Sequence, residues 1–184
     1  MRTTHIACAV LLSLAIVSPA VAQTTAPIEV FGGYSLLSAG PDDFPRQTSH
    51  GFQTSITANV NSWFGIVGDL GMQFNTTRDL GPGFSGRVAK TSVQEYLVGP
   101  RFTARERRVG VFGQFLVGLA RGVANDDFNG FSDSGLMFGG GGGFDVGINR
   151  RLAVRAQFDQ LFAFVDIAEI TSRFAVGAVV RFGL

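Results

Sequence analysis

The chain has 184 residues, with 15 basic and 14 acidic side chains, one cysteine, 25 glycines and 18 phenylalanines. A charge balance this close to zero gives no basic surface for nucleic acid, and a single cysteine forms neither an internal disulfide nor a thiolate metal site. We therefore expect no nucleic-acid partner, no metal and no cofactor.

The first 22 residues have the pattern of a secretory signal peptide. Arg2 gives a basic start, residues 6–17 are apolar, and residues 20–22 form a small-x-small cleavage motif. The apolar run is shorter than the about 20 residues that a membrane-spanning helix needs. We predict cleavage before Gln23 rather than a membrane anchor.

The rest of the chain, residues 23–184, is expected to form one domain built from strands. It has no apolar run long enough for a spanning helix, and its hydrophobic residues alternate with polar or small ones. Alternation and turn residues predict eight strands, at 28–36, 51–60, 63–74, 92–102, 109–121, 135–148, 152–162 and 172–182. The connections alternate between long ones, at 37–50, 75–91, 122–134 and 163–171, and short ones, at 61–62, 103–108 and 149–151.

The last predicted strand shows the pattern most clearly, because one of its faces is wholly apolar. That face carries Phe174, Val176, Ala178, Val180 and Phe182, and the other carries arginines and small residues. Membrane barrels have this apolar-out, polar-in arrangement, with long external loops and short periplasmic turns. We therefore predict an all-β fold, an eight-stranded antiparallel up-and-down transmembrane β-barrel. We expect it to lie in the bacterial outer membrane, where its outer face contacts lipid.

The same alternation assigns the other lipid-facing side chains. These are Val30, Tyr34, Leu36, Phe52, Ile56, Val60, Phe64, Leu70, Met72, Phe74, Tyr96, Val98, Phe102, Val111, Phe115, Val117, Leu119, Leu136, Phe138, Phe144, Val146, Ile148, Val154, Ala156 and Phe158. Trp63, Phe64 and Phe182 are expected at one membrane interface, where aromatic side chains gather.

The opposite faces collect charged side chains, which we expect to meet inside the barrel. The charged members are Glu29, Asp69, Glu95, Arg101, Asp145, Arg155, Asp159, Arg173 and Arg181, with Gln53, Thr57, Asn59, Gln73, Gln114 and Gln157 beside them. The interior of an eight-stranded barrel is only wide enough for side chains to fill. The sequence therefore predicts a lumen plugged by ion pairs, with no wide aqueous pore.

Four segments in order carry a family resemblance: residues 29–35 (EVFGGYS), 97–101 (LVGPR), 142–146 (GGFDV) and 154–159 (VRAQFD). Together they resemble the small bacterial outer-membrane β-barrel domain family, which includes the transmembrane domain of outer membrane protein A. The resemblance implies insertion into the outer membrane by the barrel-assembly machinery. It implies no single activity, since relatives of this size are structural, adhesive or weakly conducting.

The resemblance also implies an assembly signal in the last strand, formed here by Gly177, Val180 and Phe182. Members of the family usually end on the aromatic residue, whereas here Gly183 and Leu184 follow Phe182. We also expect the barrel to be monomeric.

The sequence also contains residues that could form a catalytic site. After the predicted cleavage one histidine remains, His50, beside Ser49 and near Asp42 and Asp43. Neighbouring side chains on a strand point to opposite faces, so Ser49 and His50 do not form a nucleophile and base pair. We predict no catalytic residue, although a lipid-active barrel enzyme stays an alternative.

Two other functions stay open beside an external interaction role through the loops. One is a small-solute, porin-like channel, and the other is a soluble secreted barrel of the lipocalin kind. The wholly apolar outer stripes argue against the soluble barrel, because soluble proteins rarely expose large apolar patches.

Overall fold

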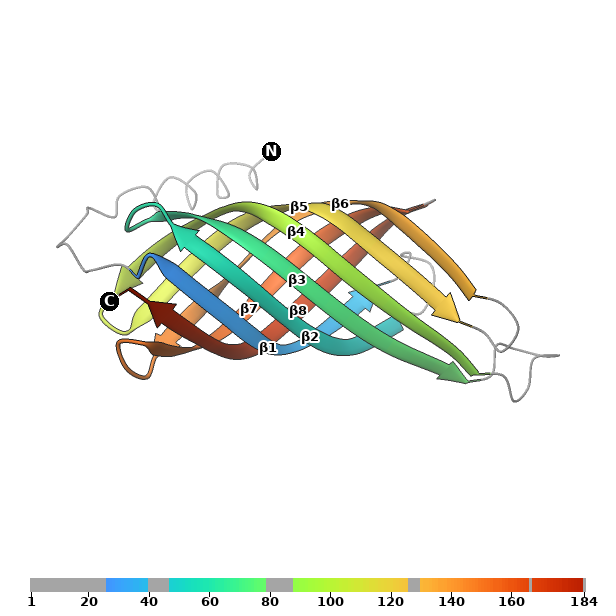
Figure 1. Cartoon of the computed structure of the whole chain (residues 1–184), viewed down its shortest axis with the longest axis horizontal. Coiled ribbons are helices and arrows are strands. Elements are labelled where there is room, and N and C mark those ends of the chain that lie inside the picture. Colours follow the sequence, from blue (N-terminus) through green and yellow to red (C-terminus); the bar gives the residue numbers. More distant parts are fainter. Residues whose placement is uncertain (1–25, 40–46, 79–87, 126–129, 166, 184) are drawn as a thin grey trace, which may run out of the picture.

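The computed structural model describes residues 26–39, 47–78, 88–125, 130–165 and 167–183. These residues form eight strands, β1 to β8 (Figure 1). Their bounds are β1 Ile28–Ala39, β2 Gln47–Asn59, β3 Phe64–Arg78, β4 Val88–Glu106, β5 Val109–Asn125, β6 Gly130–Gly147, β7 Leu152–Val165 and β8 Ile167–Phe182. In this part of the chain no helix is long and apolar enough to cross a membrane.

The strands form one closed barrel, as the sequence predicted. Each strand pairs antiparallel with the next, and β8 pairs with β1 along its length, from Ile28 opposite Phe182 to Ala39 opposite Thr171. Closure gives the strand main chain hydrogen-bond partners on both sides, so no sheet edge remains exposed to hydrocarbon.

The strands are tilted and staggered around the barrel axis, which Figure 1 shows as ribbons crossing it obliquely. A path of paired residues leads from Val30 through Ile56, Gly68, Val98, Val117, Phe138 and Phe162 to Ile170. The next residue, Thr171, pairs with Ala39, so one circuit advances about ten residues along β1. Eight strands with this stagger tilt by about 40° and leave room inside for side chains alone.

The strands extend further than predicted at the end with the long connections. Strand β3 reaches Arg78 and pairs there with Val88, although residues 75–91 were predicted to form a loop. The connections are reduced to residues 40–46, 79–87, 126–129 and 166. At this end the sequence has polar residues at successive positions, so the alternation of apolar and polar residues is lost. The antiparallel pairing nevertheless continues, because it gives the main-chain N–H and C=O groups their hydrogen-bond partners.

The short turns lie at the other end, together with the C-terminus (Figure 1). In the β2–β3 turn the Asn61 side chain accepts hydrogen bonds from the main chain of Trp63 and Phe64, at 3.0 and 2.8 Å. Asn149 does the same in the β6–β7 turn for Arg151 and Leu152, both at 2.8 Å. An asparagine that bonds the main chain two residues on is a common turn former.

The third short turn is tighter than the predicted 103–108, because β4 continues to Glu106. It contains Arg107, at φ 50°, and Arg108. At the C-terminus Gly183 has φ 79°, and a Cβ there would lie 2.5 Å from Pro27 Cγ. A glycine is needed at this position, so the residue after Phe182 turns the chain closely against the start of β1.

The outer face is apolar over most of the barrel, as the alternation predicted. Among the predicted lipid-facing side chains, Val30, Leu36, Phe64 and Ala156 are half-buried and the others are exposed. Two aromatic clusters stand on this face. One contains Trp63, Phe64 and Phe102, with ring centroids 5.5 to 6.0 Å apart, and the other contains Phe138, Phe162 and Phe164.

The interior also contains apolar side chains, beside the polar and charged ones that the sequence predicted there. One group packs Val67, Leu97, Leu116, Ala120, Met137, Leu161 and Ala163, and a second packs Phe31, Ala153, Ala175 and Val179. The narrow barrel brings these residues across the lumen from different strands. Apolar packing and polar pairing therefore share the same interior.

Inward-facing glycines lie directly against the main chain of the next strand. A Cβ at Gly99 would lie 1.7 Å from the carbonyl oxygen of Phe115, whereas outward-facing Gly32 has nothing within 4 Å of such an atom. The concave inner face of a narrow barrel leaves less room than its convex outer face.

We predict that Gly99→Ala lowers the free energy of unfolding by about 1–3 kcal/mol, because the main chain of β5 must move. The measurement is the urea midpoint in lipid vesicles, followed by fluorescence of Trp63, the only tryptophan. Gly32→Ala is the control and should keep the wild-type midpoint. Equal midpoints for both variants would contradict the steric explanation.

Candidate functional site

The charged residues of the lumen form the candidate site. They lie at alternate positions of their strands, so all point inward, away from the outer surface. Glu29, Asp69, Glu95, Arg101, Asp145, Arg155, Asp159 and Arg173 are at most 1% exposed, and the Arg181 side chain is 14% exposed. Buried charges at this density require partners, because an isolated charge in an apolar medium is very unfavourable.

Toward the long connections, Arg173 of β8 holds three carboxylates together. Its guanidinium lies 2.8 Å from Asp69, 2.8 Å from Glu95 and 2.9 Å from Asp159. Gln53 donates a further hydrogen bond to Asp69 at 2.5 Å. We call these four charged residues the upper cluster; it joins β3, β4, β7 and β8 across the lumen.

Toward the short turns, the charge balance is reversed. Arg155 donates to both oxygens of Asp145 at 2.7 and 2.9 Å, the bidentate geometry that suits a guanidinium and a carboxylate. Glu29 accepts from Arg105 at 2.5 Å and Arg181 at 3.2 Å, and lies 3.5 Å from Arg155. We call these five residues the lower cluster; it contains three arginines and two carboxylates.

Arg101 is joined to the upper cluster through a neutral side chain. It donates to Thr57 at 2.9 Å and to Gln114 at 3.0 and 2.6 Å. Gln114 in turn donates to Asp159 of the upper cluster at 2.7 Å. A hydrogen-bonded chain therefore runs from Arg101 to the upper cluster.

An aromatic ring separates the two central guanidinium groups. The Phe112 ring has Arg101 4.4 Å and Arg155 4.6 Å from its centroid, and the Phe31 ring lies 5.5 Å from Arg155. Guanidinium groups over a ring face are attracted by its quadrupole. Neither phenylalanine was singled out from the sequence, although both alternate with lipid-facing residues.

Arg105 is also a lumen residue that sequence reasoning missed, because residues 103–108 were predicted to form a turn. Strand β4 continues to Glu106, so Arg105 keeps the inward alternation of Arg101 and Thr103 and reaches Glu29. The repeated spacing of Arg101, Thr103 and Arg105 was the available signal.

Several buried oxygens in the lumen have no hydrogen-bond partner within the described residues. They are Gln53 Oε1, Ser55 Oγ, Gln73 Oε1, Glu95 Oε1 and Gln157 Oε1. Water molecules commonly satisfy such groups in polar interiors. The plug therefore contains two separate clusters of ion pairs and leaves acceptors for water.

The possible catalytic residues are not brought together by the described geometry. His50 points outward, and its Nδ1 shares a hydrogen bond with the Tyr34 hydroxyl, while Ser49 lies at the next, inward-pointing position. Asp42 and Asp43 lie outside the described residues. Over the described ranges, no group of three or more His, Cys, Asp or Glu residues is arranged to hold a metal ion.

The residues predicted for the interface and assembly signal lie near the short-turn end. Trp63 stacks on Phe102 with centroids 6.0 Å apart. Val180 and Phe182 face outward on β8, and Gly177 pairs with Gly33 across the closing seam. Their part in assembly stays a prediction.

A family model, described as outer membrane protein beta-barrel domain, matches residues 6–182 of the chain. No significant match was found among curated protein sequences. Among the solved structures that share the fold are two small surface proteins. The attachment invasion locus protein Ail of Yersinia pestis has a TM-score of 0.64 and 16% identity, over 86% of this chain and 100% of Ail. Neisserial surface protein A has a TM-score of 0.69 and 10% identity, over 87% of this chain and 100% of that protein.

We predict that Arg173→Gln lowers the free energy of unfolding by about 3–5 kcal/mol, because three buried carboxylates lose their shared cation. The urea midpoint in vesicles measures the loss. The double variant Arg173→Gln, Glu95→Gln should recover part of it, since one carboxylate is then neutral.

Arg121→Gln is the matched control, because Arg121 is exposed on β5 and should be replaceable without loss. A wild-type midpoint for Arg173→Gln would show that the upper cluster contributes nothing to stability.

Proposed function

The chain belongs to the outer membrane protein beta-barrel domain family, and we propose from this premise that it is a closed scaffold that binds a partner outside the cell through its external connections. By the general rule for such barrels, the short turns face the periplasm and the long connections face outward. The residues 1–22 would serve as the export signal. The segment ending at Phe182 would be read by the barrel-assembly machinery.

The observation that carries this proposal is the plugged lumen. Ion pairs join Arg173 of β8 to the neighbouring strand β7 and, across the lumen, to β3 and β4, and those of Glu29 and Asp145 fill the other end. Apolar side chains such as Leu116 and Leu161, both 0% exposed, also fill the interior. A barrel without an open path for solute has its outer surface and connections available for interaction.

The charges of the connections indicate the kind of partner. The four long connections contain six aspartates, Asp42, Asp43, Asp79, Asp126, Asp127 and Asp166, and two arginines, Arg46 and Arg87. Clusters of one charge attract partners of the other by raising association rates. We therefore propose a basic partner, such as a protein with a positively charged patch.

The Yersinia pestis protein Ail has been solved in complex with the heparin analogue sucrose octasulfate. Heparin-like ligands are strongly acidic. The excess of aspartates in the connections of this chain disfavours the same ligand here, so a likeness in fold does not carry over to the ligand.

We predict that cells displaying the protein bind immobilised basic proteins and leave heparin unbound. Replacing Asp42, Asp43, Asp126 and Asp127 by asparagine should reduce this binding at least about tenfold at low salt, because the attraction is electrostatic. The control replaces Arg107 and Arg108 by glutamine at the periplasmic end, which should leave binding unchanged. Binding to heparin, or binding that survives the four asparagines, would refute the proposal of a basic partner.

A small-solute channel is the second candidate function, favoured by the unpartnered oxygens of the lumen. Water at Gln53, Gln73 and Gln157 would provide a wetted path if the ion pairs opened. Opening must break the pairs of Arg155 or Arg173.

We predict that the wild type shows no large stable conductance in planar bilayers and that Arg155→Ala shows frequent openings, because Asp145 loses its bidentate partner. Arg150→Gln, in a turn outside the lumen, should behave as the wild type. A large steady pore in the wild type would instead establish the channel function and overturn the plugged scaffold.

A further inference from the structure

Two of the periplasmic turns, β2–β3 and β6–β7, are built alike. In each an asparagine side chain bonds the main chain of the turn, and the last turn residue forms a main-chain hydrogen bond to the strand on its other side. The carbonyl of Trp63 accepts from the Thr103 N–H at 2.8 Å, and the carbonyl of Arg151 accepts from the Arg181 N–H at 2.8 Å. The following residues pair in the same way, Phe64 with Phe102 and Leu152 with Val180. Arg151 therefore occupies the position that Trp63 has in the other turn.

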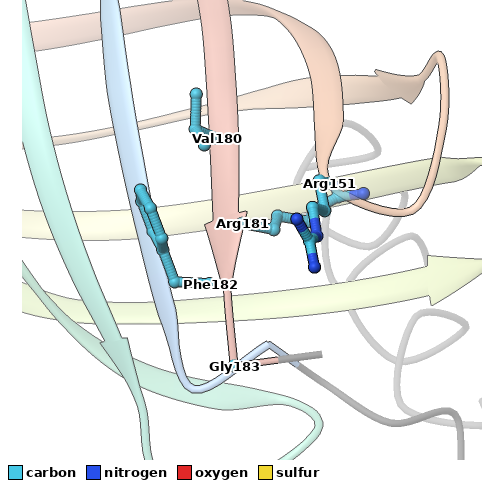
Figure 2. A pocket seen from close by; sticks show the side chains of 5 residues that line it. All are labelled: Arg151, Val180, Arg181, Phe182 and Gly183. Carbon is cyan, nitrogen blue, oxygen red and sulfur yellow. The ribbon is translucent and has the colours of Figure 1, made fainter.

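The two equivalent positions differ in what covers the barrel surface. At the first position the Trp63 ring stacks on the Phe102 ring, with centroids 6.0 Å apart. At Arg151 a depression of about 350 Å³ stays open, lined by Arg151, Val180, Arg181, Phe182 and Gly183 (Figure 2).

The lining combines one available cation with an apolar wall. Val180 and Phe182 are 38% and 50% exposed on the outer face. The Arg181 guanidinium is held in the lumen by Glu29 and Asp145, at 3.2 and 3.5 Å. Arg151 is exposed, and none of the ion pairs within the described residues includes it.

The depression lies at the level of the membrane interface. Tryptophan prefers the headgroup region of a bilayer, and the equivalent turn places Trp63 there. Phe182 is an aromatic side chain at the end of β8 and lies on the same outer face. A cation at this depth faces lipid phosphates, while the side chains beside it face acyl chains.

We propose that this depression binds an anionic phospholipid of the periplasmic leaflet. Arg151 donates to the phosphate, for which a guanidinium is well suited, and the first part of an acyl chain lies along Val180 and Phe182. This site is at the opposite end of the barrel from the proposed partner-binding connections, and it does not depend on their function.

The experiment measures lipid retention by native mass spectrometry of the full barrel released from vesicles of phosphatidylglycerol and phosphatidylethanolamine. The wild type should retain phosphatidylglycerol in preference. Arg151→Gln should reduce this retention about fivefold, the effect of one basic residue near an anionic membrane surface. Arg151→Trp should reduce it as much while folding normally, because it copies the Trp63 turn and fills the depression.

Arg150→Gln is the matched control, since Arg150 is the exposed neighbour in the same turn and does not line the depression. It should retain the lipid as the wild type does. Unchanged retention in Arg151→Gln would overturn the site. Equal losses in Arg150→Gln and Arg151→Gln would also overturn it, because they would indicate attraction of the lipid to all the basic residues of the turns.

Discussion

The pairing of β8 with β1 is the constraint on which the rest of the structure depends. In hydrocarbon an unpaired strand edge would leave main-chain groups without any partner, so the sheet has to close. Closure with eight strands and a stagger of about ten residues produces a narrow, strongly curved wall. That curvature then decides which inward positions accept a side chain and which, like Gly99, admit only glycine.

Closure also explains why the lumen is so polar and yet so completely paired. The outer face must be apolar, and the alternation of a strand leaves the inner face for charged residues. Because the lumen is narrow, side chains from opposite walls reach each other. Arg173 therefore meets Asp69 from the other side of the barrel at 2.8 Å, and the two side chains are fully buried.

The charges are also separated along the barrel axis. The upper cluster has three carboxylates around one arginine, and the lower cluster has three arginines around two carboxylates. The connections beyond each end repeat this bias, since the long ones are rich in aspartate and the short turns contain Arg107, Arg108, Arg150 and Arg151. In the orientation proposed above, the basic end faces the periplasm and suits contact with anionic lipid, and the acidic end faces outward and suits a basic partner.

The sequence by itself determined the number of strands, their faces and the inward position of Arg101 and of every charged residue in the two clusters except Arg105, because strand alternation is a local property with a period of two. Its charges also placed the acidic and basic ends. The tertiary structure alone decided which residues pair, since Glu29 and Arg181, or Glu95 and Arg173, meet only after closure brings distant strands together. The tertiary structure also decided how far the strands extend beyond their apolar residues, because that depends on pairing with the adjacent strands. The depression at Arg151 likewise depends on residues that β8 places beside the β6–β7 turn.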